Sequence, residues 1–232
     1  MSDSYLERRG EIETYFDRTA AAAWSRLTSD APVSGIRATV RAGRDKMRAT
    51  LLGFLPQDLR GMRLLDAGCG TGALAVEAAR RGADVTAVDI SPTLIGIARE
   101  RLPERLGDGR IHFIAGDMLD RKLGTFDQVV AMDSLIHYSL PDMVGMLTRL
   151  AEMSRGGVHF TYAPRTPALA AMHMIGKVFP RGDRSPRIVP HPTPSLHNAV
   201  RHHERLGGWR LGRDIRISSG FYISHAQEMT RA

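Results

Sequence analysis

The chain has 232 residues and a formal net charge of +7, and hydrophobic residues make up 43% of it. This composition is ordinary for a folded globular protein, which excludes intrinsic disorder and collagen-like structure. A single cysteine excludes an internal disulfide framework and a multi-cysteine metal site. No apolar run approaches the roughly 20 residues of a membrane span, and the polar N-terminal segment is unlike a secretory signal, so we expect a cytoplasmic protein.

The excess positive charge lies in one part of the chain. Residues 1–163 carry equal numbers of basic and acidic side chains, whereas residues 164–232 hold the whole excess and most of the nine histidines. Such an asymmetry is typical of chains with an anionic partner, and a solvated basic face would explain it equally well.

The N-terminal part of the chain has a helical pattern. Over residues 5–55 apolar side chains recur at helical spacing, as Ile12 and Phe16 do, until Pro56 interrupts the pattern. This predicts an N-terminal helical cap over residues 1–58.

From residue 63 the pattern alternates between strands and helices. The predicted strands are 63–67, 84–89, 111–115, 126–132 and 158–162, and the predicted helices are 73–81, 91–102 and 141–153. Repeated units of this size favour a doubly wound α/β fold, with a mostly parallel Rossmann-like sheet and helices on both faces. A helix near 195–206 and strands near 209–217 and 220–225 would complete a sheet of seven strands.

A proline-rich segment interrupts this rhythm after the fifth strand. Residues 163–194 hold most of the twelve prolines. A long insertion on a rigid sheet is usually functional or disordered. We therefore expect residues 59–232 to form the main domain, with 163–194 as an insertion or lid beside the site that receives the substrate.

The strongest motif is the glycine-rich turn within Leu64–Gly72, where the first strand meets the first helix of the alternating region. Its glycines are Gly68, Gly70 and Gly72, and Asp66 precedes them. Glycines at this point let a ligand approach the backbone closely, and the G-x-G-x-G spacing differs from the G-x-G-x-x-G of dinucleotide-binding turns.

Together with an acid at the end of the second strand (Asp89) and one after the third (Asp117), this turn resembles the class I S-adenosylmethionine-dependent methyltransferases over roughly residues 60–162. The resemblance implies that the turn packs against the methionine part of S-adenosylmethionine, that Asp89 binds the ribose hydroxyls, and that Asp117 meets the adenine amino group. The other cofactor contacts that it implies are Asp66, Gly68, Cys69, Gly70, Gly72, Ile90, Met118 and Met132. For each acid, a helix cap or a solvated turn is the alternative.

A narrower resemblance covers nearly the whole chain. The segments that carry it are Tyr15–Ala20 with Trp24, Val33–Met47, Asp133–Tyr138 and Gly220–Ser224. They are similar to the magnesium-protoporphyrin IX methyltransferase family of (bacterio)chlorophyll biosynthesis. Membership would imply transfer of a methyl group to one propionate of magnesium protoporphyrin IX, with S-adenosylhomocysteine and the monomethyl ester as products.

The resemblance also implies the catalytic residues. The loop after the fourth strand lies beside the reactive methyl group in this fold, which makes His137 and Tyr138 candidates. Relatives tend to have a tyrosine shortly after the N-terminal tryptophan, where this chain has Thr28. That role cannot be transferred to threonine, so Tyr15 is the candidate from this part of the chain.

A metalloporphyrin is a flat apolar plate with two carboxylates on one edge, and it requires an apolar wall and a cationic rim. We expect Met172 in the wall, because methionine suits adaptable surfaces. The expected rim residues are Arg165, Lys177, Arg181, Arg184 and Arg187. Alternatively, the apolar stripe is ordinary helix core and the arginines are solvated.

The expected partners follow from this substrate: a magnesium chelatase subunit and, peripherally, the inner photosynthetic membrane. No metal bound by the protein itself and no nucleic acid are expected. One alternative function is methylation of another small molecule, such as a quinone precursor or a different carboxylate. The others are a nucleic-acid methyltransferase, whose Asn/Asp-Pro-Pro-Tyr type of motif is absent, and a non-catalytic binding protein on the same scaffold.

Overall fold

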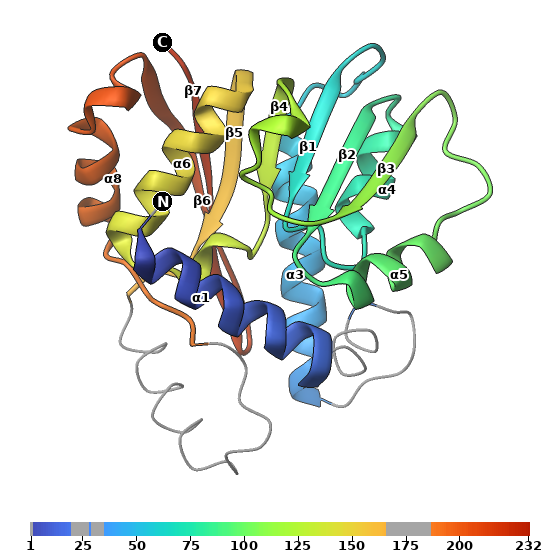
Figure 1. Ribbon diagram of the computed structural model, residues 1–232, viewed down its shortest axis with the longest axis horizontal. Helices are drawn as coiled ribbons and strands as arrows, with labels where there is room; N and C mark the ends of the chain where they lie inside the picture. The colour runs from blue at the N-terminus through green and yellow to red at the C-terminus, as the bar shows by residue number, and fades with distance from the viewer. Residues whose placement is uncertain (1, 20–27, 29–34, 166–186) are drawn as a thin grey trace.

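The computed structural model describes residues 2–19, 28, 35–165 and 187–232. Its strands are β1 (Arg63–Ala67), β2 (Asp84–Asp89), β3 (Arg110–Ala115), β4 (Phe126–Ala131), β5 (Ser154–Tyr162), β6 (Trp209–Ser219) and β7 (Tyr222–Arg231). They form one sheet in the order β3-β2-β1-β4-β5-β7-β6 (Figure 1). The first five strands pair in parallel, and β7 runs antiparallel between β5 and β6. The expected seven-stranded, mostly parallel sheet is confirmed.

The longer helices are α1 (Asp3–Thr14), α3 (Gly35–Phe54), α4 (Ala73–Arg80), α5 (Pro92–Glu100), α6 (Leu140–Met153) and α8 (Thr193–Arg201). Short turns of other helix types are η1 (Tyr15–Thr19), η2 (Arg121–Leu123), η3 (Leu135–His137) and η5 (Glu204–Leu206). The predicted helix near 195–206 is therefore α8 followed by the separate turn η5.

The helix ends follow local chemistry that is visible in the sequence. Ser91 is the N-cap of α5, where its hydroxyl accepts a hydrogen bond from the Leu94 N–H, and Pro92 takes the first helical position. Gly82 follows α4 with φ +96°, a conformation that suits glycine after a helix C-terminus.

Two strands are longer than their sequence pattern predicts. β5 begins at Ser154, before Gly156 and Gly157, and β7 continues to Arg231. Glycine is rare in strands, so the start of β5 gives a weak signal. The strand nevertheless begins there, because it pairs with β7, in which Thr230 lies opposite Gly157.

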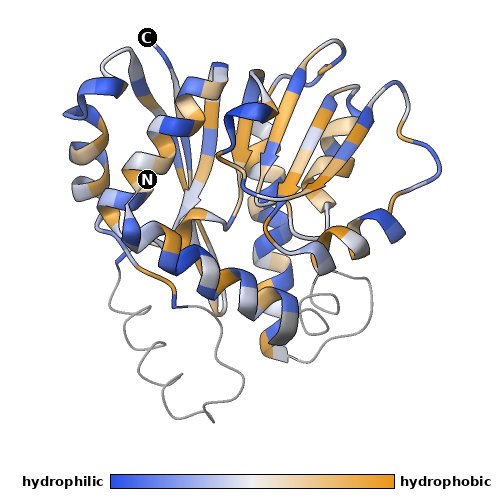
Figure 2. Ribbon diagram, viewed as in Figure 1, coloured by the Kyte–Doolittle hydropathy of each residue, from blue (hydrophilic) through white to orange (hydrophobic). Residues whose placement is uncertain are grey.

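The core is divided between the two faces of the sheet. On one face α6 and α8 pack together with Tyr5 and Ile12 of α1, and on the other α3 and α4 pack through residues such as Leu51 and Leu74. Figure 2 shows apolar strands in the middle and polar outer helix surfaces. Both N-terminal helices, α1 and α3, thus contribute to the hydrophobic cores that cover the sheet. The boundary at residue 58 between a helical cap and the main domain stays a prediction.

Among the described residues, no helix combines the length and the apolar character that a membrane crossing requires.

Candidate active site

A cavity of about 520 Å³ lies at the carboxyl ends of the central strands. The loops after β1, β2, β3 and β4 form one side of it, and α1, α3, the 187–189 region and the turn between β6 and β7 form the other. This size and this position, at the edge where the strand order reverses between β1 and β4, are typical of ligand sites in open α/β sheets. Figure 1 shows α1 crossing the sheet at this edge.

The glycine turn forms the floor of the cavity in a conformation that requires glycine. Gly68, Gly70 and Gly72 have φ values of +82°, +55° and +79°. A Cβ atom on Gly68 would lie 2.4 Å from the side chain of Ser134, and one on Gly72 would lie 2.8 Å from the ring of Phe113. The turn is therefore packed from below by β3 and from the side by the loop after β4.

Asp66 is buried beneath this turn. Oδ2 of Asp66 is buried without a hydrogen-bond partner among the described residues, while the backbone N–H of Ala75 in α4 favours the ionised carboxylate. Burial and the nearby charge of Asp89 raise the pKa of Asp66 to about 7. A cation bound beside Asp66 would compensate for this placement.

Asp89 ends β2 next to the turn. Its carboxylate accepts hydrogen bonds from the backbone N–H of Gly70 at 2.7 Å and of Ser91 at 3.0 Å. Burial raises its pKa, although these N–H groups favour the ionised form. Asp89 thus joins the glycine turn to the start of α5.

Asp117, after β3, contacts α1. Tyr5 donates its hydroxyl proton to Oδ1 at 3.1 Å, and Arg9 Nη1 donates to Oδ2 at 2.8 Å. Burial raises the pKa of Tyr5, so its phenol keeps the proton that it donates. α1 is also anchored by hydrogen bonds from Ser4 to Asp142 at the start of α6. The sequence reading missed Tyr5 and Arg9, because both fit an ordinary polar helix.

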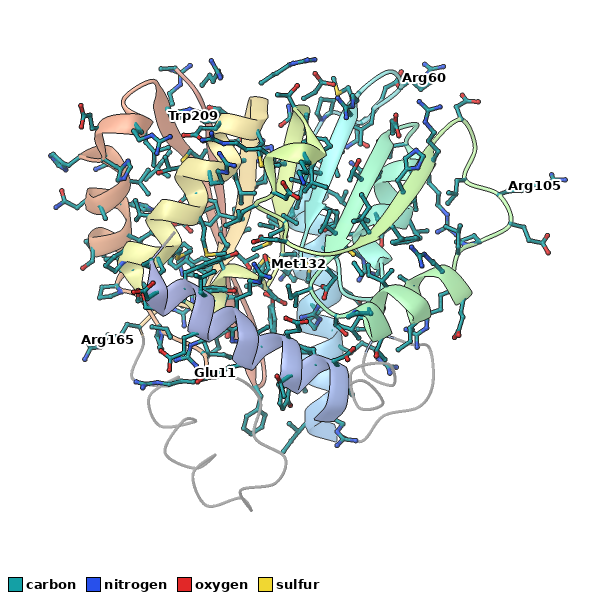
Figure 3. The ribbon with its side chains drawn as sticks, viewed as in Figure 1. Glu11, Arg60, Arg105, Met132, Arg165 and Trp209 are labelled. Atoms are coloured by element: carbon teal, nitrogen blue, oxygen red, sulfur yellow. The ribbon has the colours of Figure 1, made fainter. Side chains whose placement is uncertain are left out.

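The remaining cofactor candidates of the sequence analysis lie together, since Cys69, Ile90, Met118 and Met132 all line the cavity. Figure 3 labels Met132, which lies near the centre of the molecule. Burial and the neighbouring acids raise the pKa of Cys69 well above its usual range. Its sulfur therefore stays a thiol, which is a poor nucleophile.

His137 and Tyr138 also line the cavity. His137 ends the turn η3, and its Nδ1 lies 3.4 Å from the carbonyl oxygen of Arg187. Tyr138 stacks on Tyr5, with ring centroids 5.4 Å apart. Tyr15 lies in η1, and the cavity lining of the described chain includes its neighbour Phe16 instead.

The predicted acceptor-binding residues are only partly within the described chain. Met172, Lys177, Arg181 and Arg184 lie outside the described residues, as does Trp24. Arg165 is exposed and extends outward in Figure 3, away from Met132. Arg187 is also exposed, and its backbone carbonyl is the part that reaches His137.

The acceptor side has residues to which the sequence analysis assigned no role, although all of them lie in the segments that carry the narrower resemblance. They are Arg41 and Arg44 of α3, Asp133 after β4, and Phe221 and Tyr222 at the β6–β7 turn. A sequence signal existed for Asp133, because it lies two residues after a central strand, as Asp117 does. Among the described residues, no group of three potential ligands could hold a metal ion.

Comparison with known proteins decides the family. A model of the magnesium-protoporphyrin IX methyltransferase C-terminus matches residues 131–231, and a methyltransferase-domain model matches residues 64–157. The magnesium-protoporphyrin O-methyltransferase of Rhodobacter capsulatus is 52% identical over 98% of this chain and 99% of its own length. The chain belongs to the magnesium-protoporphyrin O-methyltransferase family.

The solved structures agree. The crystal structure of magnesium protoporphyrin IX methyltransferase from Synechocystis PCC 6803 with bound SAH has a TM-score of 0.81 and 28% identity, covering 97% of this chain and 100% of that chain. The ubiquinone biosynthesis O-methyltransferase of Xanthomonas oryzae is more distant, at 32% identity over 73% of this chain and 71% of its own. The magnesium-protoporphyrin O-methyltransferase family is thus favoured over the quinone-precursor alternative.

The glycine turn of this methyltransferase gives a direct prediction. We expect Gly72→Ala to lower the free energy of unfolding by about 1–2 kcal/mol or more, because a side chain at positive φ is strained and its Cβ would press on Phe113. Denaturant unfolding measures this change. Gly96→Ala in α5 is the matched control, because nothing lies within 4 Å of its added Cβ and alanine favours the helix. Equal stability of the two variants would contradict the packing described for the turn.

Proposed function

We propose that this chain transfers a methyl group from S-adenosylmethionine to one propionate carboxylate of magnesium protoporphyrin IX. The products are the monomethyl ester and S-adenosylhomocysteine. The observation that carries the proposal is a single cavity in which the glycine turn and its buried acids face His137 and Tyr138 across the carboxyl edge of the sheet. The 52% identity to the Rhodobacter capsulatus enzyme over nearly the full length supports the choice of substrate.

The residues at the glycine turn fit the methyl donor. S-adenosylmethionine supplies an electrophilic methyl group on a sulfonium and carries an ammonium on its methionine end. Asp66, with one buried carboxylate oxygen unpartnered among the described residues, offers a negative charge to such a cation. The turn itself presents backbone without side chains in the way, since a Cβ at Gly68 or Gly72 would have no room.

The adenosyl end of the donor is assigned to the next two acids. Asp89 lies one strand away from the turn and binds the ribose hydroxyls, with Ile90 beside it in the cavity lining. Asp117 and Met118 flank the adenine. Asp117 is supported in this role by its anchoring to Tyr5 and Arg9, which holds the carboxylate at the cavity wall.

On the acceptor side, His137 orients the reacting carboxylate or accepts its proton. Nδ1 of His137 lies 3.4 Å from the carbonyl oxygen of Arg187, and the residue lines the cavity, which places its ring beside the acceptor in this proposal. A propionic acid side chain resembles that of Glu, whose ordinary pKa is about 4.3, so it is ionised at neutral pH and a strong base is unnecessary. Tyr138 shapes the pocket by stacking on Tyr5. Positioning of the two reactants therefore supplies most of the rate.

The insertion at 163–194 completes the acceptor side in this proposal. Two contacts of its described part support this: the Val189 N–H donates to the Ile136 carbonyl at 2.8 Å, and Ile188 lines the cavity. The proposed substrate-binding residues of the insertion remain Arg165, Met172, Lys177, Arg181, Arg184 and Arg187.

Two experiments test the proposed activity. An absorbance titration with magnesium protoporphyrin IX measures binding of the acceptor, and an assay with S-adenosylmethionine labelled in the methyl group measures ester formation. A phenolic quinone precursor serves as the competing acceptor. Methylation of the phenol in preference to the porphyrin would overturn the proposal in favour of the quinone alternative.

We also propose that a magnesium chelatase subunit delivers the acceptor and that the chain works peripherally at the inner photosynthetic membrane. The chemistry supports both: the acceptor must come from an enzyme that inserts magnesium, and a flat apolar pigment partitions to bilayers. Phe221, an exposed aromatic residue that also lines the cavity, is consistent with an entrance used by such a pigment. Co-sedimentation with anionic lipid vesicles tests the membrane association. Recovery of all the protein in the supernatant would contradict it.

Replacing His137 should separate catalysis from donor binding. We expect His137→Ala to lower kcat roughly ten- to hundredfold, less than a full general base typically contributes because the carboxylate is already ionised. The dissociation constant of S-adenosylmethionine should stay nearly unchanged. His112→Ala, at an exposed position on β3, is the control with parental activity. Parental turnover in His137→Ala would remove the residue from the mechanism.

The pKa of Asp66 makes donor binding depend on pH. Because the pKa of the free carboxyl is about 7 and a cationic donor favours its ionised form, affinity should fall as pH falls through 7. Between pH 7.5 and pH 6 the dissociation constant should rise roughly eightfold, as linkage to one proton requires. Calorimetric titration measures this, and Asp66→Asn should bind more weakly with a flat profile over the same range. A parental profile without slope would show that Asp66 does not face the cation.

A further inference from the structure

The last residues of the proline-rich insertion lie along the turn that carries His137. The carbonyl oxygen of Arg187 lies 3.4 Å from His137 Nδ1, and the Val189 N–H donates to the Ile136 carbonyl at 2.8 Å. Figure 1 shows this segment leading into α8. The segment therefore touches the turn at His137 and just before it, and a third contact follows from His191.

The imidazole of His191 contacts the end of the turn. Its Nε2 lies 3.0 Å from the carbonyl oxygen of Tyr138, and only 5% of the residue is exposed. Because a carbonyl oxygen accepts a hydrogen bond and cannot donate one, Nε2 carries the ring proton. Burial lowers the pKa of His191, which favours the neutral ring with this single proton. His191 thus holds the Tyr138 carbonyl from the interior of the protein.

The backbone of His191 joins the two ends of the insertion. Its N–H donates to the Ala163 carbonyl at 2.9 Å, and its carbonyl accepts a hydrogen bond from the Arg165 N–H at 3.0 Å, which makes a short parallel bridge. Two residues further on, the Thr193 hydroxyl lies 2.9 Å from the Tyr162 hydroxyl at the end of β5. The imidazole is therefore mounted on backbone that is fixed to the sheet, so it can hold a neighbouring loop in place.

The turn is also fixed at its start. The Asp133 N–H donates to the Thr161 hydroxyl at 2.7 Å, which ties the residue after β4 to β5. The chain from Asp133 to Tyr138 consequently runs between two anchored points. His137 directly precedes the second of these points, so the position of its ring depends on the contact that His191 makes.

We propose that His191 is a positioning residue for methyl transfer: its Nε2–H holds the Tyr138 carbonyl and thereby places the His137 ring against the acceptor carboxylate. This rests on the proposed function, in which His137 orients that carboxylate or accepts its proton. His191 does not occur among the described residues that line the cavity, so it acts through the turn and not by contact with a reactant. A displacement of about 1 Å at a reacting group can lower a rate by about a hundredfold, so a single buried hydrogen bond at this place is sufficient to affect turnover.

The test uses three substitutions of His191. His191→Gln keeps an N–H donor close to the place of Nε2, His191→Asn moves the donor nearer to the backbone, and His191→Leu removes the donor at similar volume. His159→Leu is the matched control, because His159 is 2% exposed and its Nε2 lies 3.0 Å from Gln128 Oε1, outside the cavity lining. Denaturant unfolding measures the stability of each variant, and activity is expressed per folded molecule.

His191→Leu should lower kcat roughly three- to tenfold, while the dissociation constants of S-adenosylmethionine and magnesium protoporphyrin IX stay nearly unchanged. The loss should not exceed that of His137→Ala, because it arises through His137. His191→Gln should recover most of the loss and His191→Asn little of it. His159→Leu should be destabilised as well, yet keep the parental kcat. If His191→Leu does not fold, the comparison of His191→Gln with His191→Asn decides in its place.

A double-mutant cycle with His137→Ala identifies the route of the effect. If His191 acts through His137, adding His191→Leu to His137→Ala should change kcat by about twofold or less, because no ring remains to be placed. An independent structural effect would instead multiply the two losses. Equal losses from His191→Leu in both backgrounds would overturn the inference, and so would a His191→Gln variant as slow as His191→Leu.

The outcomes separate this inference from the proposed function. If the unmodified protein methylates magnesium protoporphyrin IX and His137→Ala is slow, but His191→Leu has the parental kcat, the assignment of His191 is wrong while the activity stands. If His137→Ala itself has the parental kcat, the inference fails together with the role of His137, and the substrate assignment stands. If the unmodified protein does not methylate this porphyrin, the proposed function fails and the inference with it.

Discussion

Two carboxylates buried next to one another at the ends of β1 and β2 are the constraint on which the site depends. The charge of Asp89 raises the pKa of Asp66, and burial raises the pKa of both. The glycine turn stabilises this placement, because the Gly70 N–H donates to Asp89 and because glycines without side chains leave space above the turn. The fold thus holds negative charge under an open cavity, an arrangement that a bound cation stabilises.

The opposite wall of the cavity has the complementary chemistry. There the charged groups are arginines of α3, and the buried acid among them, Asp133, serves to fix one of these arginines and to join α3 to β7 through Tyr222. Asp133 also leads directly into the turn that carries His137. The acidic wall would attract a cationic methyl donor, and the basic wall would attract an anionic acceptor. The two reactants would therefore lie next to each other in the cavity.

The sheet could be predicted closely from sequence because each of its strands has a short apolar run bounded by turn or cap residues such as Gly82 and Ser91. The cofactor side could be predicted for a related reason: its acids lie at or near the carboxyl ends of strands, so the topology alone brings Asp66, Asp89 and Asp117 to one edge. The acceptor side could not, because its residues come from a helix, a hairpin turn and a loop far apart in the chain. Nothing in a single sequence indicates that Tyr222 packs on Gly43, although that contact sets the position of α3.

The net charge of a segment does not reveal the arginines of α3 that line the cavity. Residues 1–163 are neutral as a whole, which pointed to the basic segment after residue 164. Neutrality there arises partly because Asp133, after β4, and Glu77 of α4 balance arginines of α3. Those pairs hold α3 rigidly against the sheet. A side chain on a rigid helix can orient one carboxylate of the acceptor while the other carboxylate reacts. Net charge counts solvated and paired groups alike, so a segment without net charge can still place arginines in the lining of a cavity.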